Sequence, residues 1–414
     1  MSLDREFLQC TIKGLIDTDD FTKRCWDLYD EVYNKERRPR IHLALSRNDY
    51  MLNMDQKDPS KEPVPKLIES NMVANQSGTQ CSVNVWHEYM MRTHFKQDLT
   101  PLFVGRREER NSPSGYIAAM IAVARRLYER TYDSKDTWVL IVSDPGKWSS
   151  FDESLVEIEL LDTDEKIKVM RRSFAELAKS IDAGQVEENG KLLVEGVEIA
   201  VVYMRTGMSG DDYDWAAGDW EKVRRPIELS NAVKSPCIAH QLVDSKRCQQ
   251  VICSKNNMEE YGLTGEEASK VRECCVEMLR ADGNSIKLAL TDPSNYVLKS
   301  VATEGSSYCM EGVDMVTELE RLRNKPGEER HKLLIMQKIR SPSFPNVTCA
   351  GQFGNRDSKG RQVKICPEIG IFNGLLMVDG ELVKNESLGY LMRSRINEKT
   401  ELANELFLDS AYFY

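Results

Sequence analysis

The chain has 414 residues, of which 41% are apolar and 29% charged, and it carries a net charge of -10 with a pI near 5.3. This length allows two or three domains with a sizeable hydrophobic core. The acidic balance argues against a nucleic-acid backbone or an anionic membrane as the main partner, and no apolar run approaches the length of a membrane span.

The first part of the sequence predicts a helix over about 19–35 and a strand over 41–45, followed by S-R-N-D-Y-M at 46–51. A second strand is expected at 66–71, where alternation places Glu69 and Asn71 on one face. A carboxylate and an amide are oxygen ligands that suit Mg²⁺, so this face is half of a predicted metal site. A solvated strand face is the alternative. A patterned helix from 113 to 130 follows, and its role is packing.

Strands and helices alternate between residues 137 and 244. Apolar runs at 138–142 and 199–203, a helix at 151–161 and a strand at 168–171 predict a small, mostly parallel α/β module. Ligands of such sheets bind beyond the carboxyl ends of the strands, here the loops at 143–150 and 204–207. Arg205 stands at such a strand end and is a candidate for binding a carboxylate through its guanidinium group. The alternative is that Arg205 is only a surface charge.

The last part combines helices, expected from 245 to about 281 and from 314 to 323, with strands at 296–298 and 333–339. Lys299, Glu304 and small residues at 305–307 follow the first of these strands. These residues suit a polyphosphate: the lysine can hold a phosphate, the carboxylate can share a magnesium ion with it, and the small residues let backbone amides approach closely. A polar hairpin loop is the alternative interpretation. The strand at 333–339 can lie along an adenine ring. A hairpin turn is predicted at 378–381, and Arg393 and Arg395 are expected on a short helix.

Several common site signatures are absent from the sequence. There is neither a Walker P-loop nor a Rossmann fingerprint, so a bound nucleotide would be clamped between sheets by lysines. The eleven cysteines and five histidines show no C-x-x-C pair and no ligand spacing, which argues against zinc and against a disulfide scaffold. Most thiols are expected to be reduced core residues.

Eight short stretches share an order and spacing with a known family. They are S-R-N-D-Y-M at 46–51, I-E-S-N at 68–71, F-D at 151–152, E-I-A-V-V-Y-M-R-T-G at 198–207, Q-L-V-D-S-K-R-C-Q-Q at 241–250, V-L-K at 297–299, E-I-G-I-F at 368–372 and L-M-R-S-R at 391–395. In this arrangement the sequence resembles eukaryotic glutathione synthetase over nearly its whole length, without the family's N-terminal segment.

The resemblance implies an α/β ATP-grasp fold, a homodimer, and ATP and Mg²⁺ as cofactors. Residues 1–136 would form the N-terminal part of the catalytic body, 137–244 the inserted substrate-binding module, and 245–414 the nucleotide-binding part with its lid and C-terminal segment. The implied magnesium ligands are Glu69, Asn71 and Glu304. Contacts to ATP are implied for Lys246, Lys299, Glu304, Gly305, Met336, Gln337, Lys338, Ile339, Glu368 and Arg395, the last standing where the family has a lysine. Arg47, Arg205 and Arg393 would hold substrate carboxylates and the reacting centre.

The family's substrate positions are rewritten in this sequence. Two serines of the family are Ala74 and Gln76, and a Glu, an Asn and a Gln are Lys147, Ser149 and Glu153. In the turn of Thr206, Gly207 and Met208, the methionine replaces a tyrosine, and serines at 306 and 307 replace glycines after Gly305. Each lost hydrogen bond to a charged group removes about 1.5 to 3 kcal/mol of binding. The loop that closes over the acceptor is also shortened, with 398–405 in its place.

These features predict an ATP- and Mg²⁺-dependent ligase with altered substrate preference. It would join γ-glutamylcysteine or a related thiol peptide to glycine or another amine through an acyl phosphate. The alternative is a catalytically impaired binding protein, similar to the glutathione synthetase-like effectors of plant-parasitic nematodes. A third interpretation is a synthetase of ordinary specificity with drifted loops. Small molecules are the expected partners, without nucleic acid or membrane. The family implies the cytoplasm, and secretion is the alternative if a signal peptide has been removed from the N-terminus.

Overall fold

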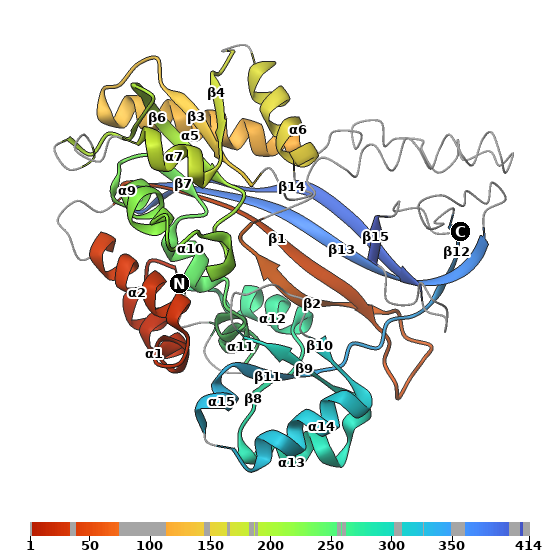
Figure 1. The fold of residues 1–414 in the computed structure, drawn as a ribbon. Coiled ribbons are helices and arrows are strands. Elements are labelled where there is room, and N and C mark those ends of the chain that lie inside the picture. The colour runs from red at the N-terminus through yellow and green to blue at the C-terminus, as the bar shows by residue number, and fades with distance from the viewer. Residues whose placement is uncertain are drawn as a thin grey trace, which may run out of the picture.

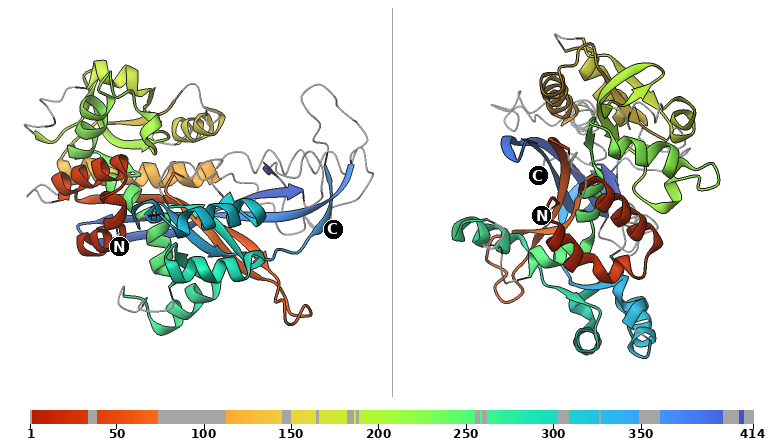
Figure 2. Two further views of the ribbon diagram at one scale, coloured as in Figure 1. Left: turned by 60° about the horizontal axis from the view of Figure 1, so that its bottom comes forward. Right: turned by 90° about the vertical axis from the view of Figure 1, so that its left-hand side faces the viewer.

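Three β-sheets organise the chain in this computed structural model (Figure 1). The structure describes residues 2–33, 39–73, 113–144, 150–163, 166–181, 186, 189–254, 258, 262–301, 309–325, 327–348, 361–396 and 406–408. A large antiparallel sheet crosses the middle, with a parallel sheet at one end of the molecule and a small antiparallel sheet at the other. The turned views of Figure 2 show the same arrangement.

The large sheet has the order β15-β14-β13-β1-β2, and β12 pairs with β13. Its strands are β1 (Ile41–Asn53), β2 (Val64–Asn71), β12 (Phe344–Thr348), β13 (Arg361–Val378), β14 (Glu381–Ile396) and β15 (Leu406–Leu408). Asp379 and Gly380 join β13 to β14 with φ angles of 51° and 87°. Positive φ at both central residues is what a type I′ hairpin turn requires, so the hairpin predicted at 378–381 is confirmed.

Two sequence predictions for this sheet are wrong. β1 continues to Asn53 instead of ending at 45, and Arg393 and Arg395 lie on β14, not on a short helix. β14 pairs with β13 along its length, and Arg393 and Arg395 stand opposite Glu368 and Cys366. Pairing with the preceding strand of the hairpin satisfies the backbone groups that a helix would have satisfied within itself.

The parallel sheet is built from β4, β3, β6 and β7, with β5 added antiparallel to β6. Its strands are β3 (Trp138–Val142), β4 (Val169–Arg172), β5 (Leu193–Val194), β6 (Val197–Met204) and β7 (Val233–Ser235), and its helices are α5 (Pro113–Tyr132), α6 (Ser150–Leu161) and α7 (Phe174–Ser180). The mostly parallel α/β arrangement predicted for this region is therefore present. The segment from 210 to 243 adds η2 (Gly210–Asp212), η3 (Trp220–Arg224), α9 (Arg225–Leu229) and α10 (Ile238–Val243).

The small antiparallel sheet has the order β10-β9-β11-β8 and carries helices on one face. Its elements are β8 (Met278–Arg280), α13 (Gly283–Thr291), η5 (Pro293–Asn295), β9 (Tyr296–Ser300), β10 (Cys309–Met310), α14 (Gly312–Arg323), α15 (Gly327–His331) and β11 (Leu333–Gln337). Helices α11 (Lys246–Cys253) and α12 (Gly265–Cys274) precede it. The predicted helical stretch to 281 is wrong at β8, because that segment pairs with β11 instead.

Two large cores hold these layers together. One lies between the large sheet, α5 and one face of the parallel sheet. The other packs α1 (Arg5–Ile16) and α2 (Asp20–Tyr33) against the opposite face of the parallel sheet, α10, α11 and the inner face of the small sheet. β2 pairs with β1 and is joined to α11 by the hydrogen bond from Gln249 to the Ile68 carbonyl, while the Ser245 hydroxyl before α11 donates to the Val301 carbonyl after β9. Among the described residues, no helix has the length and apolar content to cross a membrane.

Candidate functional site

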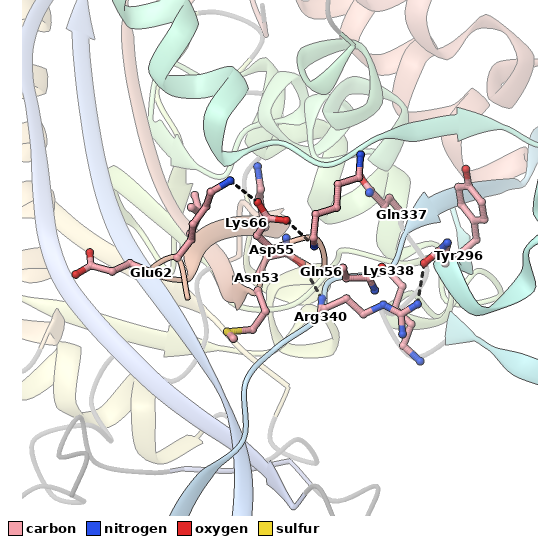
Figure 3. A pocket seen from close by; sticks show the side chains of 14 residues that line it. Asn53, Asp55, Gln56, Glu62, Lys66, Tyr296, Gln337, Lys338 and Arg340 are labelled. Carbon is pink, nitrogen blue, oxygen red and sulfur yellow. Dashed lines mark hydrogen bonds and ion pairs between the residues drawn. The ribbon is translucent and has the colours of Figure 1, made fainter. Parts of the chain in front are cut away.

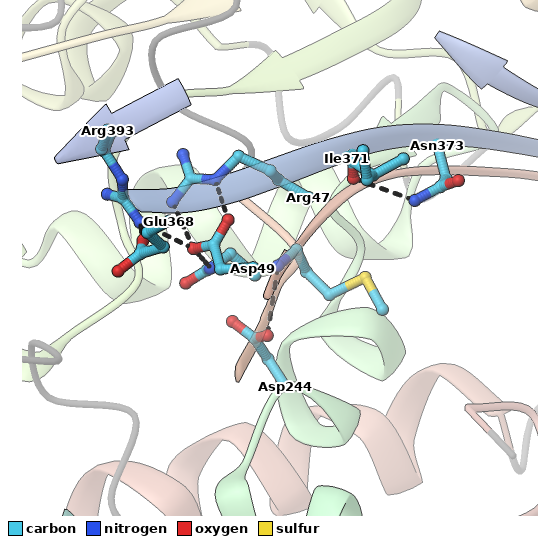
Figure 4. A network of polar contacts seen from close by, with 9 residues as sticks. Arg47, Asp49, Asp244, Glu368, Ile371, Asn373 and Arg393 are labelled. Carbon is cyan, nitrogen blue, oxygen red and sulfur yellow. Dashed lines mark hydrogen bonds and ion pairs between the residues drawn. The ribbon is translucent and has the colours of Figure 1, made fainter. Parts of the chain in front are cut away.

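A buried carboxylate, Asp49, lies at the centre of a polar network on the large sheet (Figure 4). Its two oxygens accept four hydrogen bonds, from Arg47 Nε at 2.7 Å, Arg47 Nη2 at 2.9 Å, Asn71 Nδ2 at 3.0 Å and Arg393 Nη2 at 2.9 Å. Arg47 and Asp49 share a face of β1, Asn71 comes from β2 and Arg393 from β14. Three strands thus fix the orientation of two guanidinium groups around one carboxylate.

The strand opposite Asp49 leaves room for this network. Gly370 of β13 pairs in register with Asp49, and Phe372 pairs with Arg47. A Cβ atom at Gly370 would lie 2.6 Å from Asp49 Oδ1 and 2.7 Å from Arg47 Cδ. The glycine of E-I-G-I-F is therefore required by the close approach of buried side chains, and no special backbone angle is involved.

Glu368 extends the network along β13. Its carboxylate forms an ion pair with Arg393. Burial raises the pKa of Glu368, and the positive charge of Arg393 opposes that rise only in part. Arg395, the other basic residue of L-M-R-S-R, also lowers the pKa of Glu368 and is exposed on β14.

Glu69 of β2 joins two lysines from different parts of the chain to this region. Lys246 Nζ, at the start of α11, lies 3.2 Å from Glu69 Oε2. Burial acts to raise the pKa of Glu69, but Lys246, Lys299 and Arg47 outweigh it and the pKa is lowered. The pKa of Lys299 on β9 is lowered by burial, against the attraction of Glu69 and Glu368. The carboxylate therefore remains ionised, paired with Lys246 and influenced by the positive charge of Lys299.

These residues fit a magnesium ion and a polyphosphate. Asn71 uses Nδ2 for Asp49, which leaves Oδ1 as the atom that a cation would take, and Glu69 offers an ionised oxygen two residues away on the strand. Lys246 and Lys299 supply the positive charge that phosphate oxygens need. Glu304 and Gly305, the remaining predicted residues of this group, lie outside the described residues. Within the described part of the chain, no three His, Cys, Asp or Glu side chains are placed to hold a metal by themselves.

The residues predicted to lie along the adenine ring, 336–339, face either the second core or a pocket. Met336 and Ile339 face the second core, whereas Gln337 and Lys338 line a pocket of about 560 Å³ beside the 53–66 hairpin (Figure 3). Alternation along β11 accounts for the opposite directions of Met336 and Gln337. Arg340 in this pocket donates to the Ser294 carbonyl and to Asn295 Oδ1 at 2.8 Å. The pocket borders the predicted nucleotide strand without including Lys246 or Lys299.

Four of the substrate residues predicted on the parallel module, Arg205 to Met208, lie at the carboxyl end of β6. The Arg205 side chain is fully buried, and its guanidinium donates to Asp152 Oδ2 at 2.8 Å and to the Tyr203 hydroxyl at 3.2 Å. Arg205 therefore pairs with a carboxylate of the chain itself, so the surface-charge alternative is wrong, and its contact with a substrate carboxylate stays a prediction. Glu153 is also buried, beside Asp152 on α6. Ala74, Gln76, Lys147 and Ser149 lie outside the described residues.

The turn after Arg205 is fixed by an internal carboxylate. The backbone N–H groups of Gly207, Met208 and Ser209 donate to Asp212 Oδ2 at 3.0, 2.7 and 3.1 Å. Gly207 has a φ of +89°, and its carbonyl accepts from the Tyr213 hydroxyl at 2.9 Å. Thr206 is buried in the same turn. Among the described residues, no hydrogen bond or ion pair given by the structure joins this turn to the Asp49 network.

The sequence prediction missed Asp49, Gly370 and Asp244. Asp49 could have been found, because alternation along β1 places it on the same face as Arg47. Asp244 accepts from the Met72 backbone N–H at 3.1 Å and precedes Lys246 by two residues (Figure 4). Burial raises its pKa to about 7, although Lys246 lowers it. No local sequence signal indicates this burial, since it depends on the approach of β2 to α11.

Comparisons with known proteins indicate the family of this sequence. A sequence model described as eukaryotic glutathione synthase, ATP binding domain, matches residues 1–404. The chain is 31% identical to glutathione synthetase of Homo sapiens over 423 residues, which cover 100% of this chain and 83% of that protein. It is 29% identical to the chloroplastic glutathione synthetase of Arabidopsis thaliana over 416 residues, which cover 100% of this chain and 72% of that protein.

A solved structure supports the fold. The glutathione synthetase-like effector of Globodera pallida in its apo form matches with a TM-score of 0.70 and 18% sequence identity, and the match covers 100% of this chain and 86% of that one. At this identity the likeness concerns the fold. The fold class predicted from the sequence, an α/β ATP-grasp fold with an added parallel module, is confirmed.

Proposed function

The chain belongs to the eukaryotic glutathione synthetase family, and on that premise we propose that it is an ATP- and Mg²⁺-dependent carboxylate–amine ligase with altered substrate preference. The donor would be γ-glutamylcysteine or a related thiol peptide, and the acceptor glycine or another amine. The observation that carries this proposal is the ionised Glu69, which pairs with Lys246, is affected by the charge of Lys299, and lies on the same strand as Asn71 of the Asp49 network. This arrangement suits phosphoryl transfer to a carboxylate.

The chemistry divides between charge neutralisation and alignment. The donor carboxylate attacks the γ-phosphorus of ATP and releases ADP, and the amine then displaces phosphate from the acyl phosphate and loses a proton. Lys246 and Lys299 would bind phosphate oxygens, while Glu69, Asn71 and Glu304 would hold the magnesium ion. When bound, Mg²⁺ supplies charge neutralisation at the transferring phosphoryl group. No nucleophilic side chain is required for either step.

Arg47 and Arg393 would face the reacting groups in this proposal. Each is fixed by Asp49, so the two guanidinium groups lose little further freedom when an anion binds. Asp49 is then a positioning residue, which acts through the arginines. Glu368, together with the backbone of Met336 to Ile339, would border the nucleotide, and Arg395 would add a positive charge at its edge.

The proposal of an altered substrate preference depends on the contacts that the predicted substrate residues already make within the chain. Arg205 is already paired with Asp152, and Asp212 already occupies the three N–H groups of the turn at 207–209. A substrate carboxylate at either position would have to displace an internal one. We expect a donor that differs from γ-glutamylcysteine in the part that would contact this turn.

A homodimer, as in the family, is part of the same proposal and is tested by light scattering after gel filtration.

The internal ion pair of Arg205 and the contacts of Asp212 with the turn at 207–209 also favour a second function. This function is a binding protein that holds a thiol peptide or a partner without turnover. The two functions separate in an assay of ADP release from Mg-ATP with γ-glutamylcysteine, with and without glycine. Glycine-dependent release that is lost in Glu304→Ala supports the ligase. If the protein releases no ADP but binds Mg-ATP, and Lys299→Met weakens this binding, the result supports another substrate or the binding function. Absence of nucleotide binding refutes the ligase.

A further inference from the structure

Helix α11 joins the large sheet to the small sheet through the side chains of its first residues. It contacts β2 of the large sheet and β8 of the small sheet (Figure 1). Arg247, Gln249 and Gln250 are polar, yet all three are buried. Residues three apart on a helix are neighbours on its surface, so 246 and 249 share one face while 247 and 250 share another. The two faces are bound to different sheets.

The face of Lys246 and Gln249 is bound to β2. Lys246 Nζ lies 3.2 Å from Glu69 Oε2, and Gln249 Nε2 donates to the Ile68 carbonyl at 3.2 Å. Ile68 and Glu69 are consecutive residues of this strand. The two contacts therefore fix Lys246 beside Glu69, the proposed magnesium ligand.

The face of Arg247 and Gln250 is bound to the small sheet. Arg247 Nη2 donates to the carbonyls of His331 and Leu333 at 2.8 and 3.1 Å, where β11 begins. Arg247 Nη1 donates to Gln250 Oε1 at 2.8 Å, and Gln250 Nε2 donates in turn to the Met278 carbonyl of β8 at 3.2 Å. Gln250 thus holds the guanidinium group that joins α11 to β11.

These contacts connect the two lysines proposed to bind phosphate. Lys246 directly precedes Arg247 on α11. Leu333, which accepts from Arg247, is followed by Leu334, and Leu334 pairs in register with Lys299 of β9. A short path from one lysine to the other therefore runs through the guanidinium group of Arg247.

We propose that Arg247 is a positioning residue, which sets the spacing between Lys246 and Lys299 to suit a polyphosphate and is itself oriented by Gln250. This inference rests on the ligase function proposed above and adds to it a residue that acts through the two lysines. Among the described residues, Arg247 donates to neutral oxygens, so it contributes a fixed geometry. Lysines held at a fixed spacing lose less freedom when a polyanion binds.

The test measures Mg-ATP binding to the full chain by calorimetry in a double-mutant cycle. Arg247→Met removes the forked donor at similar side-chain length and should weaken binding about tenfold. In a Lys299→Met background the same change should weaken binding less than about threefold, because the second lysine of the pair is gone. A change that acted only by lowering the folded fraction would weaken binding by the same factor in both backgrounds.

Two further variants separate geometry from charge. Arg247→Lys keeps the positive charge but loses the fork, so it should bind Mg-ATP about as weakly as Arg247→Met. Gln250→Leu keeps Arg247 but removes its support, and it should weaken binding by a smaller factor that also depends on Lys299. If Arg247→Met does not fold, the cycle is completed with Gln250→Leu. Urea unfolding and circular dichroism check that each variant is folded.

Arg125 provides a matched control. It lies on α5, its side chain is 13% exposed, and its Nε donates to the carbonyl of Thr137, just before β3, at 3.0 Å. Arg125→Met should lower the urea midpoint and leave Mg-ATP affinity unchanged.

Three results would overturn the role of Arg247 while the proposed ligase stands. They are equal factors in the two backgrounds, full affinity in Arg247→Lys, and wild-type affinity in both Arg247→Met and Gln250→Leu. Wild-type protein that does not bind Mg-ATP would instead refute the proposed ligase, and the role of Arg247 with it.

Discussion

Replacing Asp49 with alanine should strongly destabilise the protein. The Asp49 side chain is fully buried, and it accepts four hydrogen bonds from Arg47, Asn71 and Arg393. The side chains of Arg47 and Arg393 are themselves only 5% and 13% exposed. Asp49→Ala would remove the carboxylate that pairs with both arginines, and Glu368 would remain as a partner of Arg393.

The magnitude follows from the cost of breaking a buried ion pair. Removal of one partner from such a pair costs about 3 to 5 kcal/mol, since the remaining charge loses its compensation. Asp49→Asn keeps the volume but loses the negative charge, and we expect most of the same loss. Asp27 provides the matched control, because its ion pair with Lys23 has side chains 60% and 56% exposed. Asp27→Ala should cost about 0.5 kcal/mol or less.

Urea unfolding followed by tryptophan fluorescence measures these differences. The midpoint for Asp49→Ala should fall well below that of wild-type protein and of Asp27→Ala, with a similar slope in all three. A loss of less than about 1 kcal/mol in Asp49→Ala would refute the reasoning, because it would mean that the arginines find other compensation.

Three further predictions concern single positions. Gly370→Ala should cost about 1 to 3 kcal/mol in urea unfolding, because its Cβ would meet the buried network within 3 Å, whereas Gly283→Ala meets no atom within 4 Å and should cost almost nothing; equal losses would contradict this. Burial raises the pKa of Asp244 to about 7, so between about pH 4 and 7 the folded state binds a proton that the unfolded state lacks, and stability falls as pH rises. Asp244→Asn should therefore be the more stable protein near pH 8 and lose this advantage near pH 4, and an advantage independent of pH would refute the assignment. Lys299→Met should weaken Mg-ATP binding in calorimetry about ten- to a hundredfold, and unchanged affinity would exclude Lys299 from the site.

The sequence by itself determined the features that depend on neighbouring residues. The parallel α/β module follows from apolar runs alternating with helices, and the turn at Asp379 and Gly380 from a dipeptide that accepts positive φ. The placement of Glu69 and Asn71 on the same face of β2 follows from the two-residue period of a strand. The spacing of short motifs indicated the family, because many weak matches in one order are together specific.

Only the tertiary structure decided which of these residues meet. Asp49 and Arg393 are 344 positions apart, and the strand that carries Arg393 exists because it pairs with β13, where sequence reasoning predicted a helix. The burial of Arg205 against Asp152 likewise depends on how layers pack. Local periodicity records which face of an element is apolar. It carries no record of the distant partner that a buried charge finds, and that partner affects the pKa of the charged group.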